Sequence, residues 1–387
     1  MTDFALTETE RMIKKVAHDF AVKEMAPRAL EYDEREEFPW DIAKRGAALG
    51  LHGEPLAGPD LDEGIGSLII GEELAWGCGG MALGMLAGGL AATAINLIGT
   101  EEQRDRFLPM ALPHDDEFRI GALALTESES GSDAGKLKTI AKRDGDDYIL
   151  YGQKRWITGG GIADLTVVFA TEDPGMGWKG VSAFAVPKEA PGLEETHVWK
   201  KMGLRCSHTA DLMLNEVRVP ADHRLGPPDP EHRSGGRGAL GTLTGTRPQI
   251  GIMALGIGRA AFEYAAVFAK MRQSFGKPII EHQGVGFMLA DMDIALDAAR
   301  LLCWRAGWML SRGEELTLEE ASKAKAFASD AAMKVTTDAV QVLGGSGYMR
   351  DNPGEKWMRD AKVFQIFEGT NQIQRLTISR NIQERQF

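Results

Sequence analysis

Residues 138–151 read KTIAKRDGDDYILY, and this stretch shows what lies at the centre of the fold. Two alternating β-type runs, 138–143 and 148–151, flank Asp144-Gly-Asp-Asp147. An Asp-Gly pair between alternating runs is a typical turn signal, because glycine accepts the positive φ angles of a tight hairpin turn. The stretch therefore predicts a β-hairpin, and the chain changes character on both sides of it.

Further short β-type runs surround the hairpin. Residues 120–126 alternate small and apolar side chains, and 166–170, 181–186 and 212–219 are further short β-type runs separated by clusters of Gly, Pro and Asp. We therefore expect the middle part of the chain, 119–232, to form a small β-domain.

The part before it, 1–118, has helical periodicity. Thr7-Glu-Thr-Glu10 and Thr100-Glu-Glu-Gln103 have the spacing of capping boxes, in which side chains satisfy the free N–H groups that begin a helix. Pro109 is expected to end the second of these helices. The weakly polar stretch 81–98 leads into Gly-Thr-Glu-Glu-Gln, and we expect a buried helix there rather than a membrane span.

Helical periodicity returns after residues 226–241 (GPPDPEHRSGGRGALG), which have the composition of a linker. Apolar residues recur at helical spacing over 250–268 and over 285–309, where Gly313 should stop the helix. Thr317-Leu-Glu-Glu320 is expected to cap a third helix that ends at Gly344.

The order of helices, strands and helices, without βαβ alternation, predicts an α+β chain rather than a doubly wound sheet. We expect three domains: an N-terminal α-helical domain at 1–118, a middle β-sheet domain at 119–232 and a C-terminal helical domain at 233–387.

Composition narrows the possible partners. The 387 residues include 44 Lys and Arg against 56 Asp and Glu, a net charge of −12, which argues against nucleic acid and acidic lipid as partners. The three cysteines, Cys78, Cys206 and Cys303, are widely spaced, so neither a disulfide framework nor a structural zinc site is expected and a cytoplasmic location fits. The N-terminal MTDFALTETERMIKK lacks an apolar signal core, and we expect no membrane insertion.

Several common catalytic patterns are missing from the sequence. It contains no Walker A, H-E-x-x-H, G-x-S-x-G or EF-hand motif, and its eight histidines are scattered, so we expect no metal. Gly344-Gly-Ser-Gly347 follows a helical pattern rather than a strand, which argues against a dinucleotide-binding turn.

Glu368 is the first local candidate for chemistry. It follows the apolar run 363–367 and precedes Gly369. Desolvation in such a loop would raise the pKa of the carboxylate and make it a better base, whereas a solvated turn glutamate is the plainer alternative. Thr370 has the context of an N-cap, which serves the helix itself or leaves N–H groups for an anion or cofactor.

Three other residues have two possible roles each. Trp156 could stack on a flat cofactor while Thr158, on the same strand face, hydrogen-bonds its edge; an ordinary core tryptophan is the alternative. Arg247, expected just before a helix, and Arg272 could each bind a phosphate, although a surface ion pair is the commoner role of a lone arginine.

Taken together, these features resemble the acyl-CoA dehydrogenase family over nearly the whole chain. The resemblance rests on motifs at three separated places in the right order. They are LTESESGSD at 125–133, FGKPIIEHQ at 275–283, and a C-terminal block of QVLGGSGY at 341–348, MRDAK at 358–362 and QIFEGTNQIQR at 365–375.

The resemblance implies an N-terminal helical domain, a middle β-barrel-like domain and a C-terminal four-helix bundle, with FAD between the last two. It also implies α,β-dehydrogenation of an acyl-CoA thioester to the trans-2-enoyl-CoA, in which a carboxylate removes the α-proton and the β-hydrogen leaves as hydride to flavin N5. Electrons would pass to an electron-transfer flavoprotein. The implied assembly is a homotetramer, a dimer of dimers.

The family motifs also assign residues one by one. Glu368 would be the base, and its backbone N–H, together with a flavin ribityl hydroxyl, would hold the thioester oxygen. Some branches of the family take the base from the residue before the arginine at 247, but here that residue is Thr246. Arg247 would contact the CoA phosphate end or the mouth of the pocket, and Gly369 is a further substrate-binding candidate.

The remaining assignments concern FAD. The residues that would line the flavin ring are Leu125, Thr126, Trp156 and Thr158, with Thr158 near N5. Ser132 would contact the pantetheine chain of the substrate or the FAD. Thr370 and Gln372 would bind FAD phosphate or ribose. The residues that would reach the FAD of a neighbouring subunit are Arg272, Phe275, Gln283, Gln341 and Gly345.

The sequence departs from the family pattern in places. Ser128 stands where proline is usual, and Gly236 and Thr244 replace an aromatic-plus-Asp pattern before Arg247. An early motif is degraded to PLAGP at 55–59, which leaves the acyl-chain end of the pocket undefined. Three glycines, Gly84, Gly88 and Gly89, could leave room for a bulky acyl group, but close helix packing is our preferred interpretation.

Two other functions are compatible with this fold family. One is an oxidase that uses oxygen directly, which rapid reoxidation in air would reveal. The other is a flavin-binding, DNA-associated branch of the superfamily, against which the net charge of −12 and the presence of Glu368 both argue. The length and branching of the acyl chain stay open.

Overall fold

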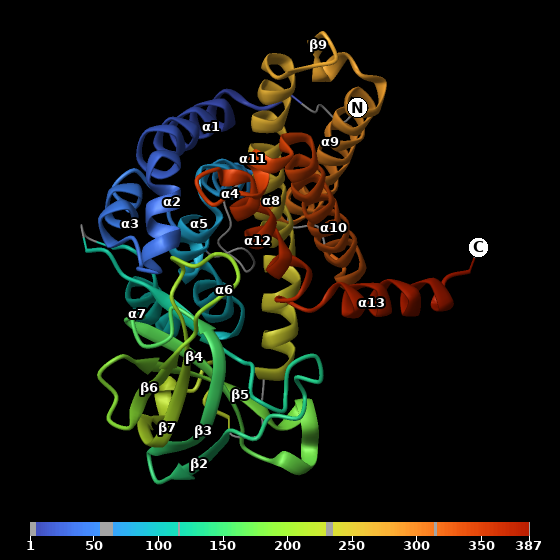
Figure 1. Cartoon of the computed structure of the whole chain (residues 1–387). Helices are drawn as coiled ribbons and strands as arrows, with labels where there is room; N and C mark the ends of the chain where they lie inside the picture. Colours follow the sequence, from blue (N-terminus) through green and yellow to red (C-terminus); the bar gives the residue numbers. More distant parts are fainter. Residues whose placement is uncertain (1–4, 55–64, 115–116, 230–234, 313–315, 387) are drawn as a thin grey trace.

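The elements follow the predicted order of helices, sheet and helices (Figure 1). The computed structural model describes residues 5–54, 65–114, 117–229, 235–312 and 316–386. In Figure 1 the sheet lies at the bottom, the N-terminal helices lie above it on the left, and the C-terminal helices lie above it on the right. The long helix α8 runs upward from the sheet between the two helical parts.

The N-terminal part consists of seven α-helices among the described residues. They are α1 Glu8–Phe20, α2 Ala29–Arg35, α3 Trp40–Ala47, α4 Gly66–Gly77, α5 Gly79–Leu86, α6 Gly88–Ile98 and α7 Glu101–Ala111. Both predicted capping boxes are present: Thr7 caps α1 with Glu10 as its partner, and Thr100 caps α7 with Gln103. The prediction that Pro109 ends α7 is wrong. The helix continues for two residues because the N–H of Leu112 still reaches the Leu108 carbonyl, 3.1 Å away.

The apolar stretch 81–98 is buried as predicted, but it forms two helices, α5 and α6, that meet at Ala87. By length and composition, Gly79–Ile98 and Gly235–Met271 could each cross a membrane, yet 89% and 61% of their most apolar windows are buried inside the protein. The glycines of this stretch serve close packing. A Cβ on Gly84 would lie 2.8 Å from the Phe38 ring, and one on Gly88 would lie 2.7 Å from the Ala111 carbonyl oxygen.

The middle part is a curled sheet of seven strands. They are β1 Gly121–Ala124, β2 Ile140–Asp144, β3 Asp147–Thr158, β4 Leu165–Thr171, β5 Val181–Pro187, β6 Leu193–Val198 and β7 Thr209–Pro220. The strand order is β1-β4-β2-β3-β7-β6, and β5 pairs with β4. Strand β4 is parallel to β1 and β2, and the other pairs are antiparallel. The predicted hairpin is β2–β3, with Asp144 opposite Asp147.

Strand β4 shows how the sheet is held. All its residues are buried, since alternate side chains enter two different cores. Val167 and Phe169 pack with α6 and α7, whereas Val168 and Ala170 pack inside the curl. Strand β6 was not predicted, because all but the first of its residues are exposed and it has no apolar alternation.

The C-terminal part is built on three long helices, α8 Gly235–Met271, α9 Gln283–Ser311 and α10 Leu318–Leu343, which pack against one another. The other elements are β8 Gln273–Ser274, β9 Lys277–Pro278, α11 Gly345–Tyr348, α12 Pro353–Lys362 and α13 Asn371–Glu384. Both α12 and α13 pack on α10. Thr317 caps α10, which ends at Gly344 as predicted, while Gly313 lies outside the described residues.

Two predictions about the start of α8 are wrong. Residues 235–241 are helical rather than part of a linker, and Arg247 lies well inside the helix rather than before it. The glycines there allow close approach to the sheet. A Cβ on Gly235 would lie 2.5 Å from Ser182 Cα, and one on Gly236 would lie 2.2 Å from the Trp178 carbonyl oxygen. This contact brings the first third of α8 to the junction of sheet and helices.

Candidate active site

Glu368 lies in the short turn between the 3-10 helix Val363–Gln365 and α13. Its φ angle is +54° and that of Gly369 is +84°, so two consecutive residues are left-handed. This conformation is strained for a residue with a side chain, at a cost of about 1–3 kcal/mol, and it persists only where the surroundings hold it.

The carboxylate of Glu368 contacts the first third of α8. Its Oε2 accepts a hydrogen bond of 3.0 Å from the hydroxyl of Thr246, a residue that is fully buried. Burial raises the pKa of Glu368, and the Thr246 hydrogen bond and the charges of Arg247 and Lys325 oppose this rise. Glu368 is only partly exposed, so the site has a desolvated carboxylate of increased basicity rather than a solvated turn glutamate.

Two side chains hold the backbone of this turn. Lys325 on α10 donates from Nζ to the Gly369 carbonyl at 2.8 Å. Gln374 on α13 donates from Nε2 to the same carbonyl at 2.8 Å and to that of Glu368 at 3.2 Å. Among the described residues no acceptor meets the backbone N–H of Glu368, which leaves this donor free beside the carboxylate.

Arg247 is buried below this turn, with 3% of its surface exposed. Its Nη1 donates to Ser322 Oγ on α10 at 3.2 Å, and its Nε has no hydrogen-bond partner among the described residues. A Cβ on Gly369 would lie 3.5 Å from its Nη2. The guanidinium is thus a buried cation near Glu368, and it is not the surface ion pair that a lone arginine usually forms.

Thr370 caps α13 as predicted, because its hydroxyl accepts from the N–H of Ile373 at 3.3 Å. Gln372 is exposed one residue into the helix. The sequence therefore predicted the cap, and Gln372 is accessible to a ligand while Asn371, between Thr370 and Gln372, is buried.

A second group of predicted residues lies on the sheet. The N–H of Arg155 on β3 donates to the Thr126 carbonyl at 2.8 Å, which brings the segment 125–126 beside Trp156. Trp156 is 55% exposed with a φ of +58°, so the interpretation as a core tryptophan is wrong. A register irregularity between Lys154 and Ile157 displaces it from regular strand alternation.

These residues fit a flavin ring. The Trp156 indole is a large aromatic surface left open near the partly exposed Thr126 and Thr158, while Leu125 is buried. A flat ring system with polar edges needs an apolar surface and nearby hydroxyl groups, and this set supplies both. Ser132 lies on an exposed loop that follows the same segment.

The third group is distant from Glu368 within one chain. Arg272, just beyond α8, Phe275 and Gln283 are exposed, and Phe275 reaches 95%. Because α8 rises about 1.5 Å per residue, its end at Met271 lies about 36 Å from Arg247. Gln341 and Gly345, near the end of α10, are also exposed. One chain therefore does not bring these residues to its own Glu368.

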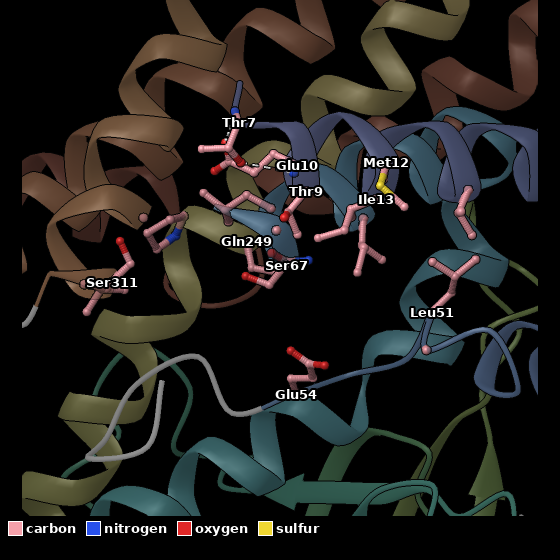
Figure 2. A pocket seen from close by; sticks show the side chains of 18 of the residues that line it. Thr7, Thr9, Glu10, Met12, Ile13, Leu51, Glu54, Ser67, Gln249 and Ser311 are labelled. Carbon is pink, nitrogen blue, oxygen red and sulfur yellow. Dashed lines mark hydrogen bonds between the residues drawn. The ribbon is translucent and has the colours of Figure 1, made fainter. Parts of the chain in front are cut away.

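A cavity of about 660 Å³ lies next to the site without including it (Figure 2). It is enclosed by α1, α4, α8, α9 and the segment around Leu51 and Glu54. Its α8 wall consists of Gly245, Pro248 and Gln249, whereas Glu368, Thr246 and Arg247 do not line it. The degraded motif at 55–59 lies outside the described residues.

Sequence reasoning missed Lys325, Ser322 and Gln374. A signal for Lys325 was present, because it stands four residues after Ala321 and three before Ala328, two fully buried residues of α10. A lysine at that spacing belongs to the buried face of the helix, and a buried lysine needs an explanation.

Comparison with known proteins shows the family of the chain. Family models for the acyl-CoA dehydrogenase N-terminal, middle and C-terminal domains match residues 7–113, 122–217 and 233–383. The short-chain-specific acyl-CoA dehydrogenase of Clostridium acetobutylicum is 38% identical, covering 98% of this chain and 99% of the relative.

Solved structures show the same relationship. The butyryl-CoA dehydrogenase of Megasphaera elsdenii superposes with a TM-score of 0.92 at 35% identity, covering 99% of this chain and 100% of that one. A chain in a structure described as the electron transferring flavoprotein of Acidaminococcus fermentans has a TM-score of 0.92 and 39% identity, covering 98% and 99%. The chain belongs to the acyl-CoA dehydrogenase family.

Proposed function

We propose that Glu368 is the base with which this chain dehydrogenates its substrate. The activity is that of its family: FAD-dependent α,β-dehydrogenation of an acyl-CoA thioester, with electrons passed to an electron-transfer flavoprotein. The observation that carries the assignment of Glu368 is its desolvated carboxylate, which is hydrogen-bonded to Thr246 and lies near the two buried cations Arg247 and Lys325.

In this mechanism the Glu368 carboxylate takes the α-proton of the thioester onto a carboxyl oxygen. Burial makes the carboxylate more basic, and the Thr246 hydroxyl fixes the orientation of Oε2. The free backbone N–H of Glu368 donates to the thioester oxygen as negative charge develops there, which makes the α-proton more acidic. The residues around Trp156 would hold FAD, which would supply the acceptor for the β-hydrogen.

We assign FAD to two surfaces. Leu125, Thr126, Trp156 and Thr158 hold the ring, and Thr370 and Gln372 at the start of α13 bind phosphate or ribose. The exposed residues Arg272, Phe275, Gln283, Gln341 and Gly345 are assigned to the FAD of a neighbouring subunit. Their exposure and the length of α8 support this assignment, and with it a homotetramer.

For the substrate, we assign Ser132 and Gly369 to the pantetheine and thioester part. Arg247 is assigned to the inner mouth of the pocket, since its burial favours this over the exposed phosphate end of CoA. The names of the relatives from C. acetobutylicum and M. elsdenii favour a short acyl chain. We propose domain boundaries at 1–118, 119–232 and 233–387. We also propose that the protein is located in the cytoplasm.

An anaerobic titration tests the proposal. Butyryl-CoA is expected to bleach the flavin absorbance of the purified enzyme, and crotonyl-CoA should be the product. Acyl-CoA thioesters of increasing length and branching then define the substrate. Reoxidation of the reduced enzyme by an electron-transfer flavoprotein but not rapidly by air supports the dehydrogenase, whereas rapid turnover with oxygen alone would identify an oxidase.

A further inference from the structure

Lys325 differs from the other lysines that are fully buried in this protein. Lys154 and Lys356 are equally inaccessible, and each forms an ion pair, with Glu127 and Asp360 respectively. Among the described residues, Lys325 has no carboxylate oxygen within 4.0 Å of Nζ. Burying an ammonium without a paired anion costs free energy. The presence of Lys325 at this buried position therefore needs a functional explanation.

The hydrogen bonds of the Lys325 side chain connect it to the turn that carries Glu368 and to the start of α13. Its Nζ donates to the Gly369 carbonyl at 2.8 Å and to Asn371 Oδ1 at 3.0 Å. Asn371 Oδ1 also accepts from Ser329 Oγ at 3.2 Å, and its Nδ2 donates to Asp330 at 2.7 Å. One ammonium therefore joins α10 to both the left-handed turn and the first residue of α13.

The charge of Lys325 also acts on the carboxylate. Glu368 and Lys325 stabilise each other's ionised forms, while Arg247 opposes and Asp330 favours the charge on Lys325. Thr246 is the remaining group that lowers the pKa of Glu368. Burial lowers the pKa of Lys325 to about 8, so the side chain is largely charged at neutral pH.

We propose that Lys325 is a positioning residue for Glu368: it holds the Glu368–Gly369 turn through the Gly369 carbonyl and supplies a buried positive charge that keeps the carboxylate ionised. The inference rests on the proposed role of Glu368 as the base. The free energy of burying the unpaired ammonium is then offset by interactions that orient and ionise one carboxylate.

The test compares Lys325→Met, which removes charge and donors, with Lys325→Gln, which removes the charge but keeps an N–H donor on a shorter side chain. Both variants should raise the pKa of Glu368, so the acidic limb of kcat/KM for butyryl-CoA should move about one pH unit higher. The kcat of Lys325→Met at its optimum should fall about 10- to 100-fold because the turn loses its tether. Lys325→Gln should recover part of that loss without restoring the acidic limb.

Lys356→Met is the matched control, since it removes a buried lysine on α12 that is bonded to Asp360 and Cys78. It should lower the thermal midpoint while leaving the acidic limb in place. Flavin absorbance and thermal midpoint of each variant are recorded alongside activity. If Lys325→Met and Lys325→Gln lose stability but keep the wild-type limb, or if neither folds, Lys325 is structural and the proposal is overturned.

Glu368→Gln is measured in the same series. If it keeps full activity, the proposed base is wrong. If it is inactive while both Lys325 variants keep the wild-type pH profile, the base is right and only the inference about Lys325 fails.

Discussion

The hydroxyl of Thr246 lies 3.0 Å from Oε2 of Glu368, although 122 residues separate them in the chain. The sequence resemblance implies that some branches of the family take the base from the position of Thr246. In this chain the positions of Thr246 and Glu368 are in contact. Thr246 therefore donates a hydrogen bond to the glutamate instead of taking its place as the base. Helix α8 thereby supplies a hydrogen-bond donor and, one residue later, the buried cation Arg247.

Thr246→Val should move the acidic limb of the kcat/KM profile to higher pH. The hydroxyl donates to the ionised carboxylate and so lowers the pKa of Glu368; without it the pKa rises and a higher pH is needed to form the base. We expect a shift of about half to one pH unit. Thr246→Ser should restore the acidic limb of the wild type. If Thr246→Val and the wild type have the same pH profile of kcat/KM, the hydrogen bond from Thr246 does not act on the base.

Glu368→Gln should lower kcat/KM about 10²- to 10⁴-fold, the usual contribution of a positioned base. Substrate binding should persist, so a spectral change of the flavin on addition of crotonyl-CoA serves as the control. Retained dehydrogenation would contradict the assignment.

The same variant should be more stable than the wild type at neutral pH. The folded-state pKa of Glu368 is raised, so its contribution to stability is fully present below the unfolded pKa and is lost as pH rises through the folded value. Glutamine does not ionise, so the variant does not lose this stability as the pH rises. At pH 7.5 the thermal midpoint of Glu368→Gln should therefore be higher than that of the wild type. At pH 4 the two thermal midpoints should be equal.

Gly369→Ala should disturb the turn. Its φ of +84° disfavours a Cβ, and that Cβ would lie 2.7 Å from Gln374 Nε2. We expect a loss of about 1–3 kcal/mol in stability and a drop in kcat. Gly284→Ala, in α9 and with no atom within 4 Å of the added Cβ, is the control and should lose neither stability nor kcat. Urea unfolding and steady-state kinetics measure both.

Trp156→Ala should weaken FAD binding with little effect on the fold. The indole is 55% exposed, so its removal costs little packing within the chain. Loss of stacking worth about 0.5–1.5 kcal/mol should raise the Kd for FAD roughly 2- to 10-fold, and Trp156→Phe should recover most of it. Fluorescence titration of the apoenzyme gives the Kd, and an unchanged value would remove Trp156 from the flavin site.

Phe275→Asp tests the contribution of a neighbouring subunit. The ring is 95% exposed at the β8–β9 turn, so a charge there should not destabilise a single chain. If Phe275 contacts the FAD of a neighbour, the variant should lose FAD and shift to smaller species in light scattering, whereas Phe275→Leu should stay assembled. A tetramer with full FAD content for Phe275→Asp would contradict that assignment.

The sequence by itself determined most of the elements and their order. Caps at Thr7, Thr100, Thr317 and Thr370 and the turn at Asp144–Asp147 were readable because each signal lies within a few residues. It failed where distant contacts override local preference. Gly235 and Gly236 are helical because they fit against the sheet, and Pro109 stays within α7 because the last turn still closes.

The motifs likewise pointed to Glu368 and Trp156, but only the tertiary structure decided their environments. Lys325 is 44 residues from Gly369 and Thr246 is 122 residues from Glu368, so their contacts exist only once α8, α10 and the turn before α13 have packed together. Burial then raises the pKa of the Glu368 carboxylate, and the same packing brings the cations Arg247 and Lys325 near it. Desolvation and charge proximity depend on distances through space, and no local pattern in the sequence records them.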